Sequence, residues 1–99
     1  MKKLKIIEVN NYDYTLKDKD GNLYELNIEF QGLKEMPQVN DIIYISEKLL
    51  DKKYKEYSNT YTFGNIDDKS GRDISTENEI DLIVIEMNNQ KYYLKRLYG

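Results

Sequence analysis

Apolar and polar residues alternate in three consecutive segments of the chain, at positions 4–9, 12–17 and 23–30. An alternation with a period of two is typical of half-buried β-strands. The phase of the first segment shifts between Ile6 and Ile7. This shift predicts a β-bulge, because one extra residue in a strand turns the side chains that follow to the other face.

Short turn sequences separate these three segments. Asn10-Asn11 lies between the first two, and the stretch 18–21 (DKDG) lies between the second and third. Asn and Gly accept the positive φ angles that tight hairpins require. Residues 3–30 are therefore predicted to form a three-stranded antiparallel meander with one face in solvent.

The remainder of the chain predicts further short strands and one helix. In chain order these are a loop (31–40), a strand with four consecutive apolar residues (42–45), a helix of about two turns (47–54), a short strand (61–63), a long acidic connection (65–79) and a final hairpin (80–87 and 92–97). Ser46 is a suitable N-cap for the helix. The apolar strands at 42–45 and 80–87 are expected to be covered on both faces. Asn88-Asn89 supplies the turn of the final hairpin.

These elements predict an all-β fold with one short helix, in a single domain of residues 1–99. Two strands covered on both faces favour a small closed or partly open β-barrel, because closure covers strand edges and fills the interior. A meander followed by a loop, a strand, a helix and more strands resembles an OB-fold. The segment 39–45 (VNDIIYI) is similar to the loop and strand at this point of OB-fold and SH3-like barrels, with Asn40 where Gly is usual. An SH3-like barrel is the alternative, and no motif identifies a characterised family.

The composition excludes several chemistries. The 99 residues carry a formal net charge of −3 and contain no His and no Cys. A thiolate nucleophile, a Cys-ligated zinc and the usual general base near neutral pH are thus all missing. The five glycines are dispersed and form no phosphate-binding loop. We therefore expect a protein that is not an enzyme and has no cofactor.

No metal site or catalytic carboxylate pair is predicted. The acidic stretch 66–77 has the spacing of a calcium-binding loop, but Ile66 stands at its first ligand position. Asp18 and Asp20 are explained by a hairpin turn. Glu25 and Glu29 share one strand face about 13 Å apart, which is too far for paired acid–base catalysis.

Two basic stretches with interleaved tyrosines are the candidate binding surface. The candidate residues are Lys91, Tyr93, Lys95 and Arg96 near the C-terminus, with Lys53 and Lys55 near the helix. A single-stranded nucleic acid is one possible partner, because OB-folds bind single strands through aromatic stacking and basic grooves. Tyr12, Tyr14 and Tyr24 on the meander are further candidates for stacking. The sequence favours instead a non-catalytic protein-interaction module with an unidentified protein partner.

No apolar run approaches the ~18 residues of a membrane span. The first residues, MKKLKIIEVN, lack the uninterrupted apolar core of a signal peptide. We therefore expect a cytoplasmic protein without a membrane segment. Lys, Asn, Ile and Tyr supply nearly half of the chain, a composition typical of AT-rich bacterial genomes.

Overall fold

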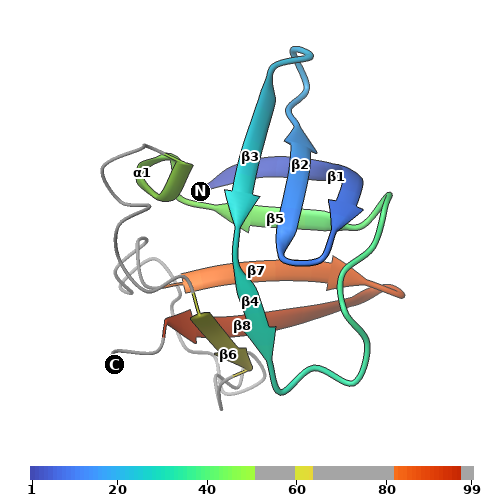
Figure 1. Ribbon diagram of the computed structural model, residues 1–99, viewed down its shortest axis with the longest axis vertical. Coiled ribbons are helices and arrows are strands. Elements are labelled where there is room, and N and C mark those ends of the chain that lie inside the picture. The colour runs from blue at the N-terminus through green and yellow to red at the C-terminus, as the bar shows by residue number, and fades with distance from the viewer. Residues whose placement is uncertain (51–59, 64–81, 97–99) are drawn as a thin grey trace.

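The computed structural model describes residues 1–50, 60–63 and 82–96 (Figure 1). Strands dominate this part of the chain, which confirms the predicted all-β class. The elements are β1 (Lys2–Asn10), β2 (Asp13–Lys17), β3 (Leu23–Asn27), β4 (Glu29–Gln31), β5 (Ile42–Ile45), α1 (Glu47–Leu50), β6 (Thr60–Phe63), β7 (Leu82–Met87) and β8 (Gln90–Arg96). The predicted connection 65–79 and the predicted second half of the helix lie outside the described residues.

The predicted meander is present. β1, β2 and β3 pair antiparallel in chain order. The β1–β2 ladder shifts register between Ile6 and Glu8, so Ile7 is the extra residue of the predicted bulge. Asn11 has a φ of 55° and Gly21 a φ of 86°, the left-handed conformations that the two predicted turns require. Local sequence signals therefore fix this part of the fold.

β5 lies between β1 and β7, and pairs antiparallel with both. Ile43 and Ile45 are fully buried, whereas Ile42 and Tyr44 on the other face are half-buried. Asn40, just before β5, has a φ of 81°, so it adopts the conformation for which Gly is usual at this place. The predicted strand is confirmed, but it is fully covered on one face only, because the face of Ile42 and Tyr44 is half-buried.

The helix begins where the sequence predicts. The Ser46 side-chain Oγ accepts a hydrogen bond of 3.2 Å from the backbone N–H of Lys48 at the start of α1. This contact satisfies one of the N–H groups that the first turn of a helix leaves without a backbone partner. The predicted N-cap is therefore confirmed.

The final hairpin and the short strand are also confirmed. β7 and β8 pair antiparallel through a turn in which Asn88 and Asn89 have φ angles of 50° and 63°. Two consecutive positive φ values are the signature of a type I′ hairpin turn. β6 pairs antiparallel with β8 on one side and parallel with β4 on the other.

The strands form one sheet in the order β3-β2-β1-β5-β7-β8-β6-β4. A closed barrel is not confirmed, because no ladder joins the end strands β3 and β4 in the described part of the chain. These two strands follow one another along the chain and are separated by Ile28, so they cannot pair side by side, and β4 continues the line of β3 in Figure 1. The final hairpin lies inside the sheet, with β5 on one side of it and β6 on the other.

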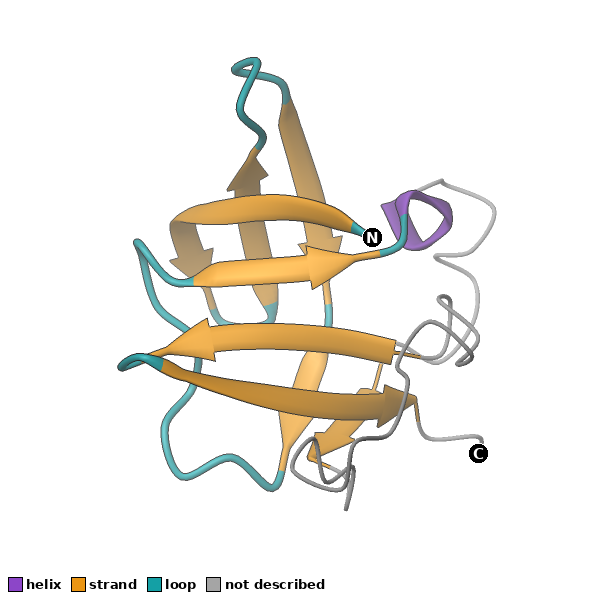
Figure 2. Ribbon diagram, turned by 180° about the vertical axis from the view of Figure 1, so that it is seen from behind, coloured by secondary structure: helices purple, strands orange, loops and turns teal. Residues whose placement is uncertain are grey.

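The sheet curls, so that its strands enclose a single main core. β1, β5, β7 and β8 run side by side across the molecule, and β2, β3 and β4 cross behind them (Figure 2). Inside, Tyr14 and Phe30 make an edge-to-face contact with ring centroids 5.3 Å apart. The core residues with no exposed surface come from β1, β2, β5, β7 and β8: Leu4, Ile6, Leu16, Ile43, Ile45, Ile83, Ile85 and Leu94. Burial of this apolar surface is the main force that holds the sheet in its curled form.

Candidate functional site: a lysine-lined groove

Three lysines gather on the outer face of the β1–β2 hairpin. Leu4 and Ile6 point into the core, so the alternating residues Lys3 and Lys5 point outward and are exposed. Lys17 of β2 lies directly opposite Lys5 in the ladder and is exposed as well. Directly opposite side chains of antiparallel strands have Cβ atoms about 4.5–5.5 Å apart. We call Lys3, Lys5 and Lys17 the lysine cluster.

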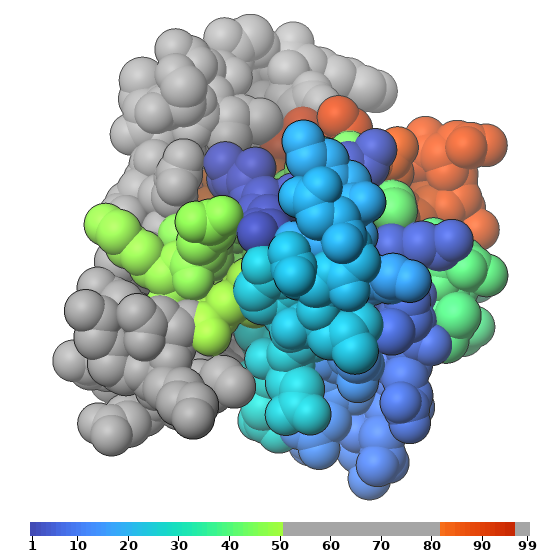
Figure 3. Space-filling model, turned by 90° about the horizontal axis from the view of Figure 1, so that it is seen from above, coloured from blue at the N-terminus to red at the C-terminus, as the bar shows by residue number. Residues whose placement is uncertain are grey.

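The lysine cluster lines a groove of about 1020 Å³. Its walls come from β1, the β2–β3 turn, β5 and α1, and in Figure 3 the start of β1 (dark blue) lies between α1 (yellow-green) and the β2–β3 turn (light blue). Six lysines and three acidic residues line it: Lys2, Lys3, Lys5, Lys17, Lys19 and Lys48, with Asp18, Asp20 and Glu47. The groove therefore carries an excess of positive charge, although the whole chain is acidic.

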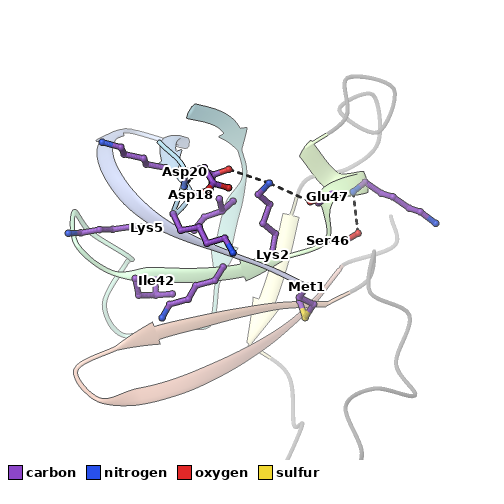
Figure 4. A pocket seen from close by; sticks show the side chains of 13 residues that line it. Met1, Lys2, Lys5, Asp18, Asp20, Ile42, Ser46 and Glu47 are labelled. Carbon is purple, nitrogen blue, oxygen red and sulfur yellow. Dashed lines mark hydrogen bonds and ion pairs between the residues drawn. The ribbon is translucent and has the colours of Figure 1, made fainter. Parts of the chain in front are cut away.

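One of these lysines is held by an internal network. The Lys2 Nζ donates a hydrogen bond of 2.8 Å to the Tyr24 hydroxyl. It also lies 3.4 Å from Asp18 Oδ2 and 3.4 Å from Glu47 Oε1 (Figure 4). The hydrogen bond to Tyr24 is the largest cause that raises the pKa of Lys2 above its usual 10.5, burial acts against it, and the bonds to Asp18 and Glu47 add to it. Lys2 thus connects the start of β1 to the β2–β3 turn and to α1 through polar contacts.

The Asp18 carboxylate is saturated with hydrogen bonds. Its Oδ1 accepts bonds of 2.9 Å from the backbone N–H groups of Asp20 and Asn22, and its Oδ2 accepts bonds from the Asn22 side chain at 3.0 Å and the Tyr24 hydroxyl at 3.3 Å. Burial would raise the pKa of Asp18, but the hydrogen bonds from Asn22, Asp20 and Lys2 outweigh it and hold the pKa well below its usual 3.8. Asp18 is therefore ionised at neutral pH and has no proton to give as a general acid.

The charges of the lysine cluster are not matched in this way. Lys3, Lys5 and Lys17 make no ion pair or hydrogen bond through their ammonium groups within the described residues. Figure 4 shows Lys5 directed away from the network of Lys2. The groove thus contains one neutralised cationic centre and a neighbouring cluster of free ammonium groups.

The outer face continues from β1 across β5 and β7 to β8. Tyr44 on β5 donates a hydrogen bond of 2.9 Å to Glu86 Oε2 on β7, and the Lys91 Nζ lies 5.6 Å from the Tyr44 ring centroid. The hydrogen bond to Glu86 is the largest cause that raises the pKa of Tyr44, and burial adds to it. The ring and the hydroxyl of Tyr44 are therefore both engaged.

The predicted basic surface at the C-terminus is only partly formed. Lys91, Tyr93 and Lys95 alternate along the outer face of β8, and both lysines are exposed. Tyr93, in contrast, is only 7% exposed and packs with Leu82 and Val84 in a small second cluster. Its ring belongs to this packing and is not open for stacking. The exposed part of the predicted surface is thus reduced to separate lysines.

The other predicted site residues are not brought together with them. Arg96 is half-buried and points to the opposite face of β8 from Lys95. Lys53 and Lys55 lie outside the described residues. The candidate surface that the sequence singled out is therefore not assembled into one patch in the part of the chain that the structure describes.

The three tyrosines predicted as stacking platforms also have different environments. Tyr12 is 56% exposed at the β1–β2 turn, whereas Tyr14 is 3% exposed and packs on Phe30 in the core. The Tyr24 ring is covered by the Lys2 Nζ, 4.8 Å from its centroid. They do not form a common aromatic surface.

The sequence reading missed the lysine cluster. The alternation of β1 was a signal that Lys3 and Lys5 share the solvent face. Their proximity to Lys17 depends on the ladder register, which the bulge at Ile7 and the turn at Asn11 determine together. Both local features were predicted, but the pairing that follows from them was not.

In the described ranges, no group of three or more acidic side chains is placed to hold a metal ion. No helix among the described residues is long and apolar enough to cross a membrane. Comparison of the chain with protein-family models, with curated proteins and with solved structures finds no match.

Proposed function

We propose that this protein is a non-catalytic protein-interaction module, and that its groove binds an acidic segment of a partner protein. The observation that carries the proposal is the lysine cluster: Lys3, Lys5 and Lys17 line the groove, and their ammonium groups have no partner among the described residues. Complementary charge steers a partner toward such a surface and fixes its orientation. The curled, OB-fold-like sheet is the scaffold that presents the groove, and cytoplasmic location is part of the proposal.

The lining of the groove supports a protein partner. Ile42 contributes apolar surface beside the lysines, and the aliphatic stems of lysine side chains are themselves apolar. Asp20 and Glu47 add negative charges that a polypeptide with mixed charges tolerates better than a continuous phosphate backbone does. A mixed lining of this kind resembles the polar rim of a protein–protein interface and not its apolar core.

The composition and the hydrogen bonds of Asp18 support a binding role. The chain has neither His nor Cys, and the carboxylate of Asp18 in the groove is already committed to hydrogen bonds. A general acid or base near neutral pH needs a pKa near the working pH. The low pKa of Asp18 is far from this requirement.

The experiment compares two double variants as bait for protein capture. Lys5→Glu/Lys17→Glu reverses the charge of the groove, and Lys91→Glu/Lys95→Glu reverses the charge of β8. After treatment of the lysate with nuclease, a carbodiimide that joins amines to carboxylates is added, and cross-linked peptides are identified by mass spectrometry. We expect Lys3, Lys5 or Lys17 to be joined to Asp or Glu of a specific protein, and this product to disappear only in the groove variant.

Single-stranded nucleic acid is the second candidate, which the lysine excess of the groove favours. Against it, among the described residues the rings of Tyr24 and Tyr44 are occupied by lysines and those of Tyr14 and Tyr93 are buried, so the described surface offers few rings for base stacking. Titration of a labelled mixed-sequence oligonucleotide decides between the two. Binding that falls steeply as salt rises, together with loss of all protein capture after nuclease treatment, would replace the proposed function by this one.

A further inference from the structure

We infer that the groove recognises an extended polypeptide segment with acidic side chains at alternate positions, i and i+2. This inference rests on the proposed function, and it names the pattern that the partner must carry. It follows from the positions of Lys3, Lys5 and Lys17 on the β1–β2 ladder.

The spacing along β1 sets the pattern. Lys3 and Lys5 are two residues apart on one strand face, so their backbone positions are separated by about 6.6 Å. An extended segment has the same rise, and its side chains i and i+2 point to one side at about the same separation. Two acidic residues at these positions are therefore in register with the two lysines. Adjacent acidic residues would point to opposite sides, and only one of them would face the groove.

The pairing of Lys5 with Lys17 across the two strands determines which acidic residue of the partner binds more strongly. Lys17 lies directly opposite Lys5, and neither ammonium group has a partner in the part of the chain that the structure describes. A carboxylate above Lys5 therefore meets two positive charges, whereas one above Lys3 meets the charge of a single cluster lysine. The carboxylate above Lys5 also relieves the repulsion between Lys5 and Lys17. This position is expected to dominate recognition.

The β5 side of the groove favours a partner segment in an extended conformation. Ile42 of β5 lies opposite Lys5 on the side away from Lys17, and it is half-buried. The lysines thus have charge on the β2 side and apolar surface on the β5 side. A segment that runs along β1 can place acidic side chains over the lysines and rest its backbone and small side chains against Ile42.

The test uses two fluorescent peptides of identical composition and net charge. Both are threonine-rich to favour the extended state, and each contains two glutamates, at alternate positions in the first peptide and at adjacent positions in the second. Because charge and composition are equal, any difference in Kd measured by fluorescence anisotropy reports the spacing. We expect the alternate peptide to bind about fivefold more tightly, the effect of one or two exposed ion pairs.

Variants locate the effect. Lys5→Glu/Lys17→Glu should weaken the alternate peptide by about tenfold or more and abolish the preference between the two peptides. Lys34→Glu is the control for a charge reversal outside the groove, because Lys34 is exposed and does not line the groove. This control should retain both the affinity and the preference.

The possible failures are distinguishable. If both peptides bind equally and both are weakened by Lys5→Glu/Lys17→Glu, the groove binds acidic segments without reading their spacing; the inference is then overturned and the proposed function stands. If neither peptide binds and the oligonucleotide does, the inference and the proposed function are both overturned. If Lys5→Glu/Lys17→Glu still binds the alternate peptide more tightly than the adjacent one, the inference is also overturned, because another surface then recognises the spacing.

Discussion

Lys5 on β1 lies directly opposite Lys17 on β2, and both side chains are exposed at the edge of the groove. Like charges that face each other across an antiparallel pair destabilise the pair. A purely structural hairpin would be more stable with opposite charges here. The same two lysines therefore destabilise the hairpin and provide the charge for the binding that we propose. Stability and binding can be measured separately.

Lys17→Glu should stabilise the protein while it weakens binding. Replacing the repulsive pair with an attractive one is expected to raise the free energy of unfolding by about 0.2–1 kcal/mol, toward the lower end because both groups are in solvent. Urea unfolding at low salt measures the change, which should shrink as salt screens the charges. Lys5→Glu/Lys17→Glu again places like charges opposite one another, so its stability should stay close to that of the wild type. A Lys17→Glu protein that is less stable than the wild type would contradict this account.

The pH dependence of stability should report the Asp18 network. The folded protein holds the pKa of Asp18 below its usual 3.8, so folding favours the ionised carboxylate. Its stabilising contribution is complete above about pH 5, and is lost as the pH falls below 3.8 toward the folded pKa. Asp18→Asn should lower Tm at neutral pH, and the gap between variant and wild type should narrow as the solution is acidified. Thermal unfolding followed by circular dichroism across this range measures the gap.

Asp20→Asn is the matched control for this experiment. Asp20 is in the same turn, but its carboxylate is exposed and accepts no hydrogen bond within the described residues. Its Tm should follow that of the wild type in parallel across the pH range. If Asp18→Asn also runs parallel to the wild type, the hydrogen bonds to the carboxylate do not stabilise the folded state.

Two isoleucines in strands should differ sharply in their contribution to stability. Ile43 is fully buried in the middle of the sheet, whereas Ile7 is 37% exposed at the bulge. Ile43→Ala should reduce the free energy of unfolding by about 2–5 kcal/mol, because it removes buried methyl groups and leaves a cavity. Ile7→Ala should cost much less, since the side chain is already partly in solvent. Equal losses in chemical denaturation would show that the bulge residue packs more tightly than its exposure indicates.

Local signals predicted the local features of this fold. The phase shift at Ile6 and Ile7 predicted the bulge, and Asn88-Asn89 predicted a turn that the structure forms with two positive φ angles. Ser46 predicted the start of α1. These predictions succeed because the physical cause, a steric limit on φ or an unpaired N–H group, lies within a few residues of the signal.

Features that depend on distant partners were not predictable in the same way. Alternation shows which residues share a strand face, but it does not say which strand lies alongside. The parallel pairing of β4 with β6 and the position of the β7–β8 hairpin inside the sheet are choices of this kind. The burial of Tyr93 follows from the same limit, because its neighbours Leu82 and Val84 belong to another strand. For the same reason, the lysine cluster was visible only once the register was known.

Asn40 offers a direct test of how the chain enters β5. Its φ of 81° is in the left-handed region, and its backbone N–H donates a hydrogen bond of 2.9 Å to the Ile6 carbonyl on β1. Asn40→Ala should lower the free energy of unfolding by about 1–2 kcal/mol, because a side chain with a Cβ and no local hydrogen bonding is disfavoured there. Asn40→Gly should be tolerated, since Gly adopts this conformation without a steric penalty. Gln38→Ala, an exposed change in the same loop, serves as the control and should shift stability by less than about 0.5 kcal/mol. If Asn40→Ala and Asn40→Gly proved equally stable in urea unfolding, the left-handed conformation would not constrain the residue at this position.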